Sequence, residues 1–185
     1  MIKLILASNS PRRLELLKGL DLKFEVRVKN GVVENYPANL PAEQVPEYIS
    51  KEKAAAYDIQ AGETLLTADT VVIYKGTIMG KPKNATEAKA MLHELSGHTH
   101  HVVTGVSITT RERQVSFSDI TAVTFCNLTE DEINYYVEYY KPFDKAGAYG
   151  VQEWIGYIGV TRIEGSFYNV MGLPVERVYQ VLKEF

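Results

Sequence analysis

Residues 4–17 read Leu-Ile-Leu-Ala-Ser-Asn-Ser-Pro-Arg-Arg-Leu-Glu-Leu-Leu, and the rest of the chain is organised around this stretch. The unbroken apolar run Leu4–Ala7 is typical of a strand buried on both faces of a sheet. Ser10 is a favoured N-cap, and Pro11 at the first helical position lacks an amide hydrogen that would have no partner there. We therefore expect a strand that passes through a short polar turn into a helix, which Gly19 ends.

The turn at Ser8–Ser10 is a candidate anion site. A helix N-terminus leaves backbone N–H groups without partners and carries the positive end of the helix dipole. Arg12 and Arg13 add two permanent positive charges at the same place. Phosphate is the commonest candidate for such a site. The alternative is a solvated pair of arginines on an exposed first turn, and this stretch alone leaves both interpretations open.

Composition excludes several classes of protein. The 185 residues fit one domain, or one domain with a lobe, and 45% hydrophobic and 23% charged residues are typical of a soluble globular protein. The net charge of −3 argues against nucleic-acid polymers and anionic membranes as partners. Cys126 is the only cysteine, so we expect no internal disulfide and a cytoplasmic location. We expect neither a signal peptide nor a membrane-spanning helix, which needs ~20 apolar residues.

A carboxylate stands inside the second predicted strand. Thr64–Ile73 reads as a buried strand, but Thr67, Asp69 and Thr70 interrupt its apolar run. A buried carboxylate costs free energy unless it is paired or binds a metal ion. Asp69 is therefore a candidate functional residue.

Three further charged residues are candidates that also have simpler explanations. The helix predicted over Pro46–Tyr57 places Lys53 on the apolar face, where it either extends along the edge of the core or points into a site. Lys81 follows a glycine that allows the backbone to approach a ligand, although Gly-Lys-Pro alone is a weak signal. Glu34 stands in a proline-containing loop, and a lone glutamate in a loop is usually solvated.

The remaining elements are predicted from capping and periodicity. Helices are expected to begin at Asn84 (with a capping box to Glu87), Thr129 and Pro174; strands are expected over Lys23–Val28, 98–110, Val115–Asn127 and Ile158–Ile163; a loop is expected over Gly165–Gly172. His98 and His100 share one strand face, and without a nearby cysteine or acidic ligand we expect them at the surface or at a strand edge. The tyrosines of residues 135–140 are expected to serve helix packing rather than base stacking.

The segment Asp144–Gln152 is rich in small residues. Such residues leave room for a ligand, and the carboxamide of Gln152 can form hydrogen bonds with the edge of a base. A flexible connection is the alternative, and composition leaves both open.

Seven short motifs occur in a fixed order. They are Ser8-Asn9-Ser10-Pro11-Arg12-Arg13, Lys53-Ala54, Ala68-Asp69-Thr70, Gly80-Lys81-Pro82, Ser96-Gly97 with Thr104-Gly105, Asp144–Gly150 with Gln152, and Asn169–Pro174. Together they closely resemble the Maf family of nucleoside triphosphate pyrophosphatases over nearly the whole chain. The form of the sixth motif, with Thr70, resembles the branch that acts on dTTP and UTP rather than the branch that acts on 7-methyl-GTP. Val151 and Ser50 differ from the residues that are common at these positions in the family, and neither difference affects the predicted chemistry.

The resemblance implies a fold and an activity. The fold is α/β, with an elongated mixed β-sheet flanked by helices as in inosine triphosphate pyrophosphatases. We expect one domain over residues 1–185, with two lobes around a central cleft, and a homodimer. The implied activity is hydrolysis of dTTP, UTP and modified pyrimidine triphosphates to the monophosphate and pyrophosphate, by attack of water assisted by Mg²⁺ or Mn²⁺.

The resemblance also implies roles for individual residues, which agree with the need of phosphoryl transfer for positioning and charge neutralisation. The predicted catalytic residues are Asp69, Lys53 and Lys81; the metal ligands are Glu34 and Asp69; the substrate-binding residues are Ser8, Ser10, Arg12, Arg13, Thr70 and Gln152. Asp69 either holds the metal or orients and deprotonates the attacking water. Gln152 can read the O4 and N3–H edge that uracil and thymine share.

Two other functions stay open at this point. One is removal of purine triphosphates, as in the inosine triphosphate relatives. The other is a nucleotide-binding regulator of septum formation that needs no catalysis, because members of the family have been linked to inhibition of septation.

Overall fold

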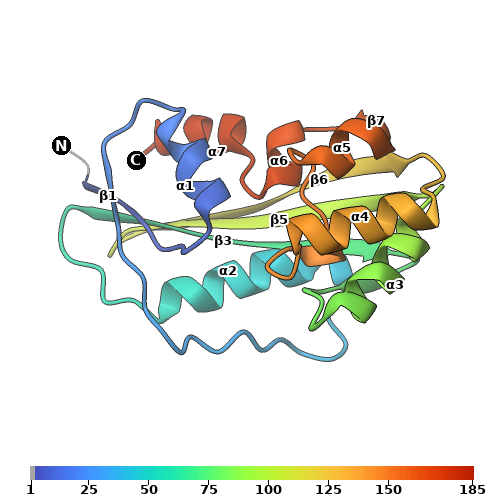
Figure 1. The fold of residues 1–185 in the computed structure, drawn as a ribbon. Helices are drawn as coiled ribbons and strands as arrows, with labels where there is room; N and C mark the ends of the chain where they lie inside the picture. Colours follow the sequence, from blue (N-terminus) through green and yellow to red (C-terminus); the bar gives the residue numbers. More distant parts are fainter. Residues whose placement is uncertain (1–2) are drawn as a thin grey trace. The chain divides into compact units, whose positions relative to one another are not determined.

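The computed structural model describes residues 3–185, which adopt a mixed α/β fold (Figure 1). The strands are β1 (Lys3–Leu6), β2 (Phe24–Val26), β3 (Glu63–Tyr74), β4 (Thr77–Met79), β5 (Thr99–Thr109), β6 (Gln114–Phe125) and β7 (Val160–Glu164). The α-helices are α1 (Pro11–Lys18), α2 (Val45–Ala55), α3 (Ala85–Leu95), α4 (Glu130–Tyr140), α5 (Trp154–Gly159), α6 (Phe167–Met171) and α7 (Val175–Leu182), with 3₁₀ turns η1 (Ala42–Gln44) and η2 (Ala146–Ala148). Within residues 3–185 no helix has the length and apolar character needed to cross a membrane.

One mixed sheet joins the seven strands of residues 3–185. Its order is β2-β1-β3-β5-β6-β7, and β4 pairs with β3 outside this path. β1 is parallel to both of its neighbours, whereas β4 is antiparallel to β3 and β7 is antiparallel to β6. Leu4, Ile5 and Leu6 of β1 are all buried, as their unbroken apolar run predicts. The predicted α/β fold, a mixed sheet flanked by helices, is confirmed.

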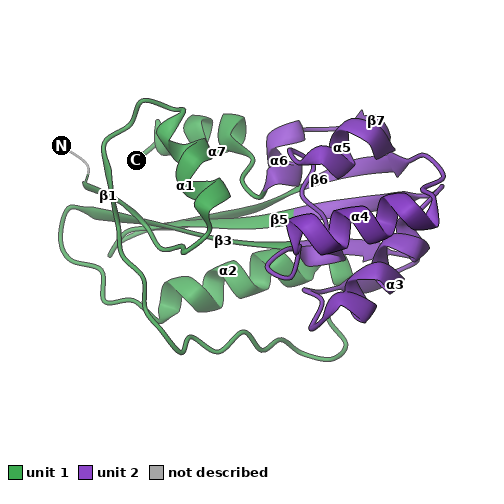
Figure 2. Ribbon diagram, in the orientation of Figure 1, with its two compact units in different colours: residues 1–70, 104–119, 172–185 green, residues 71–103, 120–171 purple. Residues whose placement is uncertain are grey.

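The chain forms two compact units, which Figure 2 colours separately. Unit 1 consists of Met1–Thr70, Thr104–Asp119 and Gly172–Phe185, and unit 2 consists of Val71–Val103 and Ile120–Met171. Within unit 1, α1 and α7 lie on one side of the strands and α2 lies on the other (Figure 2). The long strands β3, β5 and β6 contribute residues to both units.

Local signals placed most element boundaries correctly. Helix α1 begins at Pro11 with Ser10 as its N-cap, and α4 begins with the expected capping box at Thr129. At α3 the capping is only half as expected: the Asn84 side chain accepts the N–H of Glu87, but the Glu87 carboxylate accepts the N–H of Lys83.

The strand predicted over Thr64–Ile73 is confirmed: β3 runs through Asp69 without a break, because its ladder is made by backbone groups that do not depend on side-chain polarity. Two predictions of secondary structure need correction. The strand predicted over Ile158–Ile163 begins later than expected, because residues 154–159 form helix α5 and β7 begins at Val160. The predicted loop after Gly165 contains α6. Helices of five or six residues are too short to show a helical period in the sequence.

Gly105 allows helix α2 to lie directly on the sheet. A Cβ atom added at this position would lie 2.0 Å from the backbone nitrogen of Glu47 and 2.2 Å from the carbonyl carbon of Pro46. Both atoms belong to the first turn of α2, which cannot move aside as a flexible side chain does. The glycine in the Thr104-Gly105 motif therefore sets how closely α2 packs, and α2 carries Lys53.

Glu63 anchors the first residue of β3 through charged contacts. Its carboxylate accepts two hydrogen bonds from the Arg27 guanidinium, at 2.9 and 2.7 Å, and one from the backbone N–H of Gln60 at 3.0 Å. The Lys3 ammonium on the adjacent strand lies 3.4 Å away. The bond to Arg27, followed by the bond from Gln60, lowers the pKa of the Glu63 carboxyl to about 2. This cluster ties β1, β3 and the segment after β2 together.

We expect Glu63→Gln to destabilise the protein at neutral pH and to have little effect in acid. Because the pKa of Glu63 is about 2 in the folded protein and 4.5 ordinarily, its contribution is complete above pH 4.5 and is lost as the pH falls towards 2. Thermal melts across this range measure it: the difference in Tm from wild type shrinks on acidification. Glu25→Gln, at an exposed carboxylate paired with Lys3, is the control and changes Tm little. A difference that persists unchanged in acid contradicts this account.

We expect Gly105→Ala to lower the free energy of unfolding by about 3 kcal/mol, because the new methyl group overlaps the backbone of α2. Urea denaturation measures this loss. Gly80→Ala is the matched control: a Cβ there meets no atom within 4 Å, so the change stays below about 0.5 kcal/mol. Equal effects of the two substitutions would contradict the close approach of α2.

Candidate functional site

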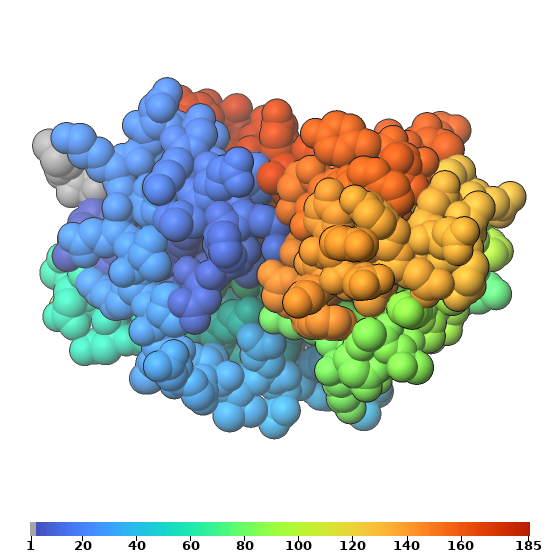
Figure 3. All heavy atoms as spheres, viewed as in Figure 1, coloured from blue at the N-terminus to red at the C-terminus, as the bar shows by residue number. Residues whose placement is uncertain are grey.

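The turn between β1 and α1 is built by its own hydroxyl groups. Ser8 Oγ accepts the N–H of Ser10 at 3.1 Å, and Ser10 Oγ accepts the N–H of Arg13 at 3.4 Å as the helix cap. Both hydroxyls act here as acceptors, so each keeps a hydrogen to donate to an anion. In the space-filling view the N-terminal segments, coloured blue, form much of the visible surface of unit 1 (Figure 3). The predicted strand, polar turn and helix are confirmed.

The Arg13 guanidinium is held in a fixed orientation within unit 1. Its Nε donates to the carbonyl of Gly172 at 2.8 Å, and its Nη2 donates to Thr70 Oγ1 at 3.0 Å. The hydroxyl of Thr70 also shares a hydrogen bond with that of Thr104 at 2.8 Å. The arginine is therefore held directly by two segments of the chain, and a third segment holds Thr70 through the hydroxyl of Thr104.

Electrostatics connect Arg13 with the acidic residues of the candidate site. Burial lowers the pKa of the Arg13 guanidinium; the charge of Asp69 raises it, the charge of Arg12 lowers it, and the charge of Glu34 raises it. An arginine nevertheless stays charged in a protein. Unit 1 thus places a half-buried positive charge of fixed orientation within the field of two carboxylates.

Lys53 brings the predicted acidic residues together. Its Nζ lies 3.1 Å from Asp69 Oδ1 and 3.1 Å from Glu34 Oε1, and it donates to the carbonyl of Ala68 at 3.2 Å. The side chains of Lys53 and Asp69 are each 17% exposed, whereas that of Glu34 is 56% exposed. Lys53 therefore points toward two carboxylates, and Glu34 forms an ion pair although its side chain is largely exposed.

The oxygen atoms around Lys53 fit a hard divalent cation. Glu34 and Asp69 converge on one ammonium, so their carboxylates lie within a few ångströms of a common point. Mg²⁺ is often bound through only one or two carboxylates, with water and substrate phosphates as the other ligands. Within residues 3–185 no group of three or more His, Cys, Asp or Glu side chains is placed to hold a metal ion.

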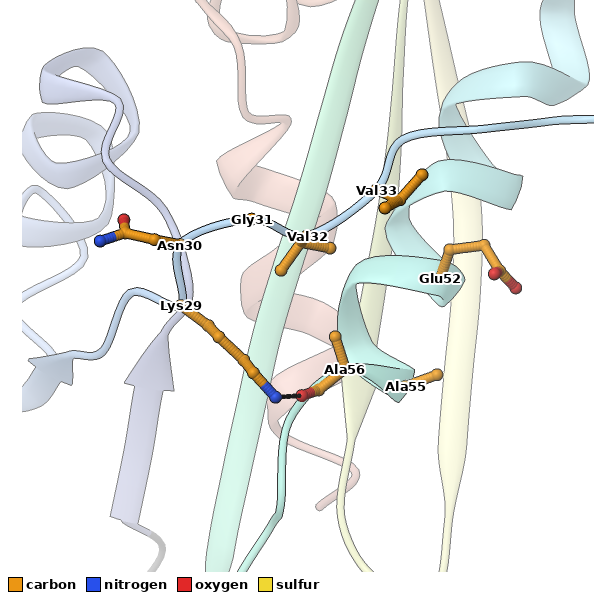
Figure 4. A pocket seen from close by; sticks show the side chains of 8 residues that line it. All are labelled: Lys29, Asn30, Gly31, Val32, Val33, Glu52, Ala55 and Ala56. Carbon is orange, nitrogen blue, oxygen red and sulfur yellow. Dashed lines mark hydrogen bonds between the residues drawn. The ribbon is translucent and has the colours of Figure 1, made fainter.

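A separate cavity of about 360 Å³ lies beside the C-terminal turn of α2 (Figure 4). Residues 29–33 line one side, and Glu52, Ala55 and Ala56 line the other. Lys29 Nζ donates to the Ala56 carbonyl at 2.7 Å, as the dashed line in Figure 4 marks. None of the predicted site residues lines this cavity. The loop of residues 29–34 is thus attached to α2 at two points. Lys29 contacts the Ala56 carbonyl, and Glu34, one residue beyond the cavity lining, contacts Lys53.

Two predicted site residues belong to unit 2. Lys81 is exposed and follows β4. Gln152 is half-buried, and its carbonyl oxygen Oε1 is buried without a hydrogen-bond partner among residues 3–185. A buried acceptor of this kind costs free energy until a donor reaches it, so Gln152 is suited to accept from a ligand.

The prediction for His100 is wrong. Its side chain is 1% exposed, and its Nε2 shares a 2.6 Å hydrogen bond with the Tyr149 hydroxyl. Burial, with a smaller contribution from His101, lowers the pKa of His100 to about 4, so the ring is neutral at neutral pH. The alternation of the strand was read correctly, but the face that carries His100 is covered by Tyr149 and Phe125, whereas Thr99 and His101 on the opposite face are exposed. Periodicity alone cannot report that.

The sequence did not identify the residues that orient the predicted site residues through hydrogen bonds. Thr104 and Gly172 contact the Thr70–Arg13 pair, and the carbonyl of Ala68 contacts Lys53. Their membership of recurrent motifs, Thr104-Gly105 and Asn169–Pro174, was the only signal available. Nothing in a hydroxyl or a carbonyl group by itself indicates such a role.

This chain is similar to known proteins over nearly its whole length. The family model for Maf-like proteins matches residues 3–185. A protein named dTTP/UTP pyrophosphatase from Phocaeicola vulgatus is 56% identical over 98% of this chain and 95% of its own length. Another of the same name, from Parabacteroides distasonis, is 56% identical over 99% of this chain and 96% of its own length.

Solved structures support the fold. A HAM1 protein from Coxiella burnetii superposes with a TM-score of 0.52 at 15% sequence identity and covers all of both chains. The Ham1 protein of Staphylococcus aureus gives a TM-score of 0.52 at 14% identity over 98% of each chain. At such low identity the likeness concerns the fold alone. The family match across residues 3–185, together with relatives that are more than half identical, shows that this chain belongs to the Maf family.

Proposed function

We propose that this protein is a nucleoside triphosphate pyrophosphatase that hydrolyses dTTP and UTP, and modified pyrimidine triphosphates, to the monophosphate and pyrophosphate. The observation that carries the proposal is the Lys53 ammonium in contact with Glu34 and Asp69, in the unit that also holds the fixed Arg13 guanidinium. The name shared by the relatives, dTTP/UTP pyrophosphatase, supports the choice of substrate.

The cations and hydroxyls of the site match the charge of a triphosphate. Arg12, Arg13 and Lys53 neutralise phosphate oxygens, Ser8 and Ser10 donate neutral hydrogen bonds beside the N-terminus of α1, and Lys81 supplies a further charge. Water breaks the anhydride bond between the α and β phosphates, so that pyrophosphate leaves. Positioning and charge neutralisation of this kind provide most of the catalysis in phosphoryl transfer.

Asp69 is the residue best placed to handle the attacking water. Its carboxylate is mostly buried and is oriented by Lys53 at 3.1 Å. A carboxylate in this position either accepts the proton of the water or holds the metal, and Glu34 is its partner in the second case. When bound there, Mg²⁺ or Mn²⁺ supplies positive charge to the phosphate oxygens and orders water.

Gln152 is proposed to read the base. Its buried Oε1 accepts the N3–H that uracil and thymine share, and its amide hydrogens donate to O4. One Maf-like domain over residues 1–185 with two lobes around a central cleft and a homodimer stay predictions that follow from the family resemblance. A cytoplasmic location stays a prediction that follows from the single cysteine, Cys126. Size-exclusion chromatography with light scattering measures the oligomeric state.

Product analysis with a panel of triphosphates and Mg²⁺ tests the activity. We expect pyrophosphate and monophosphate from dTTP and UTP, and slower turnover of purine nucleotides. Release of orthophosphate contradicts the proposal, and preference for inosine triphosphate supports the purine alternative. Asp69→Asn is expected to lower kcat by about 10²-fold or more, because the carboxylate that handles water is lost.

Asp58→Asn is the matched control, since this exposed aspartate of unit 1 contacts only Gln60 among the hydrogen bonds described and lies outside the site. We expect it to keep wild-type activity. Glu34→Gln separates the two roles of Asp69. If both acidic residues hold the metal, both variants need more Mg²⁺ for half-maximal rate; if Asp69 is the base, only Glu34→Gln does. A septation effect that survives Asp69→Asn in cells argues for a regulator instead.

Thr70→Val tests the contact between Thr70 and Arg13. We expect kcat/KM to fall about tenfold and by the same factor for dTTP and UTP, because the lost hydroxyl positions a phosphate-binding arginine. Thr70→Ser keeps the hydroxyl and should retain most of the activity. A change confined to the ratio between bases would show instead that Thr70 contacts the base.

A further inference from the structure

Tyr136 is the one tyrosine of α4 whose side chain is fully buried; Tyr135, Tyr139 and Tyr140 are 43%, 68% and 36% exposed. Its hydroxyl joins Gly150, in the segment of small residues Asp144–Gln152, to Glu153, which directly follows that segment. It donates to Glu153 Oε1 at 2.7 Å and accepts the backbone N–H of Gly150 at 3.0 Å. The residue between these two partners that bears a polar side chain is Gln152.

The segment from Gly150 to Glu153 is closed by a second contact. The backbone N–H of Glu153 donates to the Gly150 carbonyl at 3.0 Å, which makes a tight turn around Gln152. The Lys145 ammonium lies 3.5 Å from Glu153 Oε1 and neutralises the carboxylate that Tyr136 contacts. Both ends of the turn are therefore held by groups outside it.

The Tyr136 hydroxyl stays a donor at every physiological pH. Burial, followed by the hydrogen bond to Glu153, raises the pKa of the Tyr136 hydroxyl well above its usual range. The hydroxyl therefore does not ionise, and its orientation between a carboxylate and an N–H group is unambiguous, since the carboxylate can only accept.

The turn leaves little room for Gln152 to move. A Cβ atom added at Gly150 would lie 2.7 Å from Glu153 Oε1 and 3.1 Å from Gln152 Nε2, so the carboxamide packs against the bare backbone of the glycine. The other end of the carboxamide, Oε1, is buried without a partner among residues 3–185. The turn thus restricts the movement of Gln152, while its Oε1 forms no hydrogen bond with the described residues.

We propose that Tyr136 is a positioning residue for base selection: by joining Gly150 to Glu153, its hydroxyl fixes the carboxamide of Gln152 so that Oε1 meets a donor on the base. This inference rests on the proposed function. A fixed carbonyl oxygen favours uracil and thymine, whose N3 carries a hydrogen, over cytosine, whose N3 is an acceptor. A carboxamide that is free to rotate can present its N–H₂ group to cytosine instead, so loss of the network costs selectivity.

Tyr136→Phe removes the hydroxyl and keeps the ring. We expect KM for UTP to rise about tenfold with kcat changed less than about threefold, and the ratio of kcat/KM between UTP and CTP to fall about tenfold. Tyr140→Phe is the matched control, because its ring stacks on Tyr136 at 5.1 Å but its position is partly exposed. It should leave the ratio unchanged. Glu153→Gln keeps an acceptor for the hydroxyl and should restore most of the selectivity that Glu153→Ala loses.

Calorimetric binding of UMP and CMP separates this inference from the proposed function, because it requires no turnover. If the wild-type protein prefers UMP and Tyr136→Phe loses this preference, the inference is supported. Failure of the wild-type protein to release pyrophosphate would contradict the proposed function but not this inference. A folded Tyr136→Phe protein with wild-type preference for UMP overturns the inference, and so does an equal loss for both nucleotides. If Tyr136→Phe does not fold, as judged by its Tm, Glu153→Ala provides the same comparison at a partly exposed position.

Discussion

The contact between one ammonium group and two carboxylates is the constraint on which the candidate site depends. Lys53 Nζ lies 3.1 Å from an oxygen of each carboxylate and offsets the repulsion between their charges. The other carboxylate oxygens stay available for a metal ion or water. Helix α2 positions Lys53, and the absence of a side chain at Gly105 allows α2 to pack closely against the sheet.

In each unit, hydrogen bonds from neighbouring residues fix the position of a polar group that we assign to the ligand. In unit 1, Thr70 and the Gly172 carbonyl brace the Arg13 guanidinium. In unit 2, Tyr136 and Glu153 brace the turn that carries Gln152. Burying such groups costs desolvation free energy, which their hydrogen bonds only partly offset. What is gained is preorganisation, because a side chain that is already oriented loses little entropy when a ligand binds.

Local physics made much of the fold predictable. The apolar run of β1, the Ser10 cap and the capping box at Thr129 are signals carried by adjacent residues, and they locate the elements correctly. Asp69 was recognisable as a functional candidate because a carboxylate in a buried strand costs free energy unless it is paired or binds a metal ion. Helices α5 and α6 were not, since they are too short for a period to appear. His100 was misplaced because its burial depends on Tyr149, 49 residues further along the chain.

The amino-acid sequence by itself determined the kinds of elements, the chemistry available and, through seven ordered motifs, the family. Only the tertiary structure decided which of these groups touch. Asp69 meets Lys53 across 16 residues, Thr70 meets Arg13 across 57, and the Gly172 carbonyl meets Arg13 across 159. Periodicity and capping act over one or two turns of chain, whereas such contacts arise from strand pairing and helix packing. Partners of this kind follow from the fold as a whole.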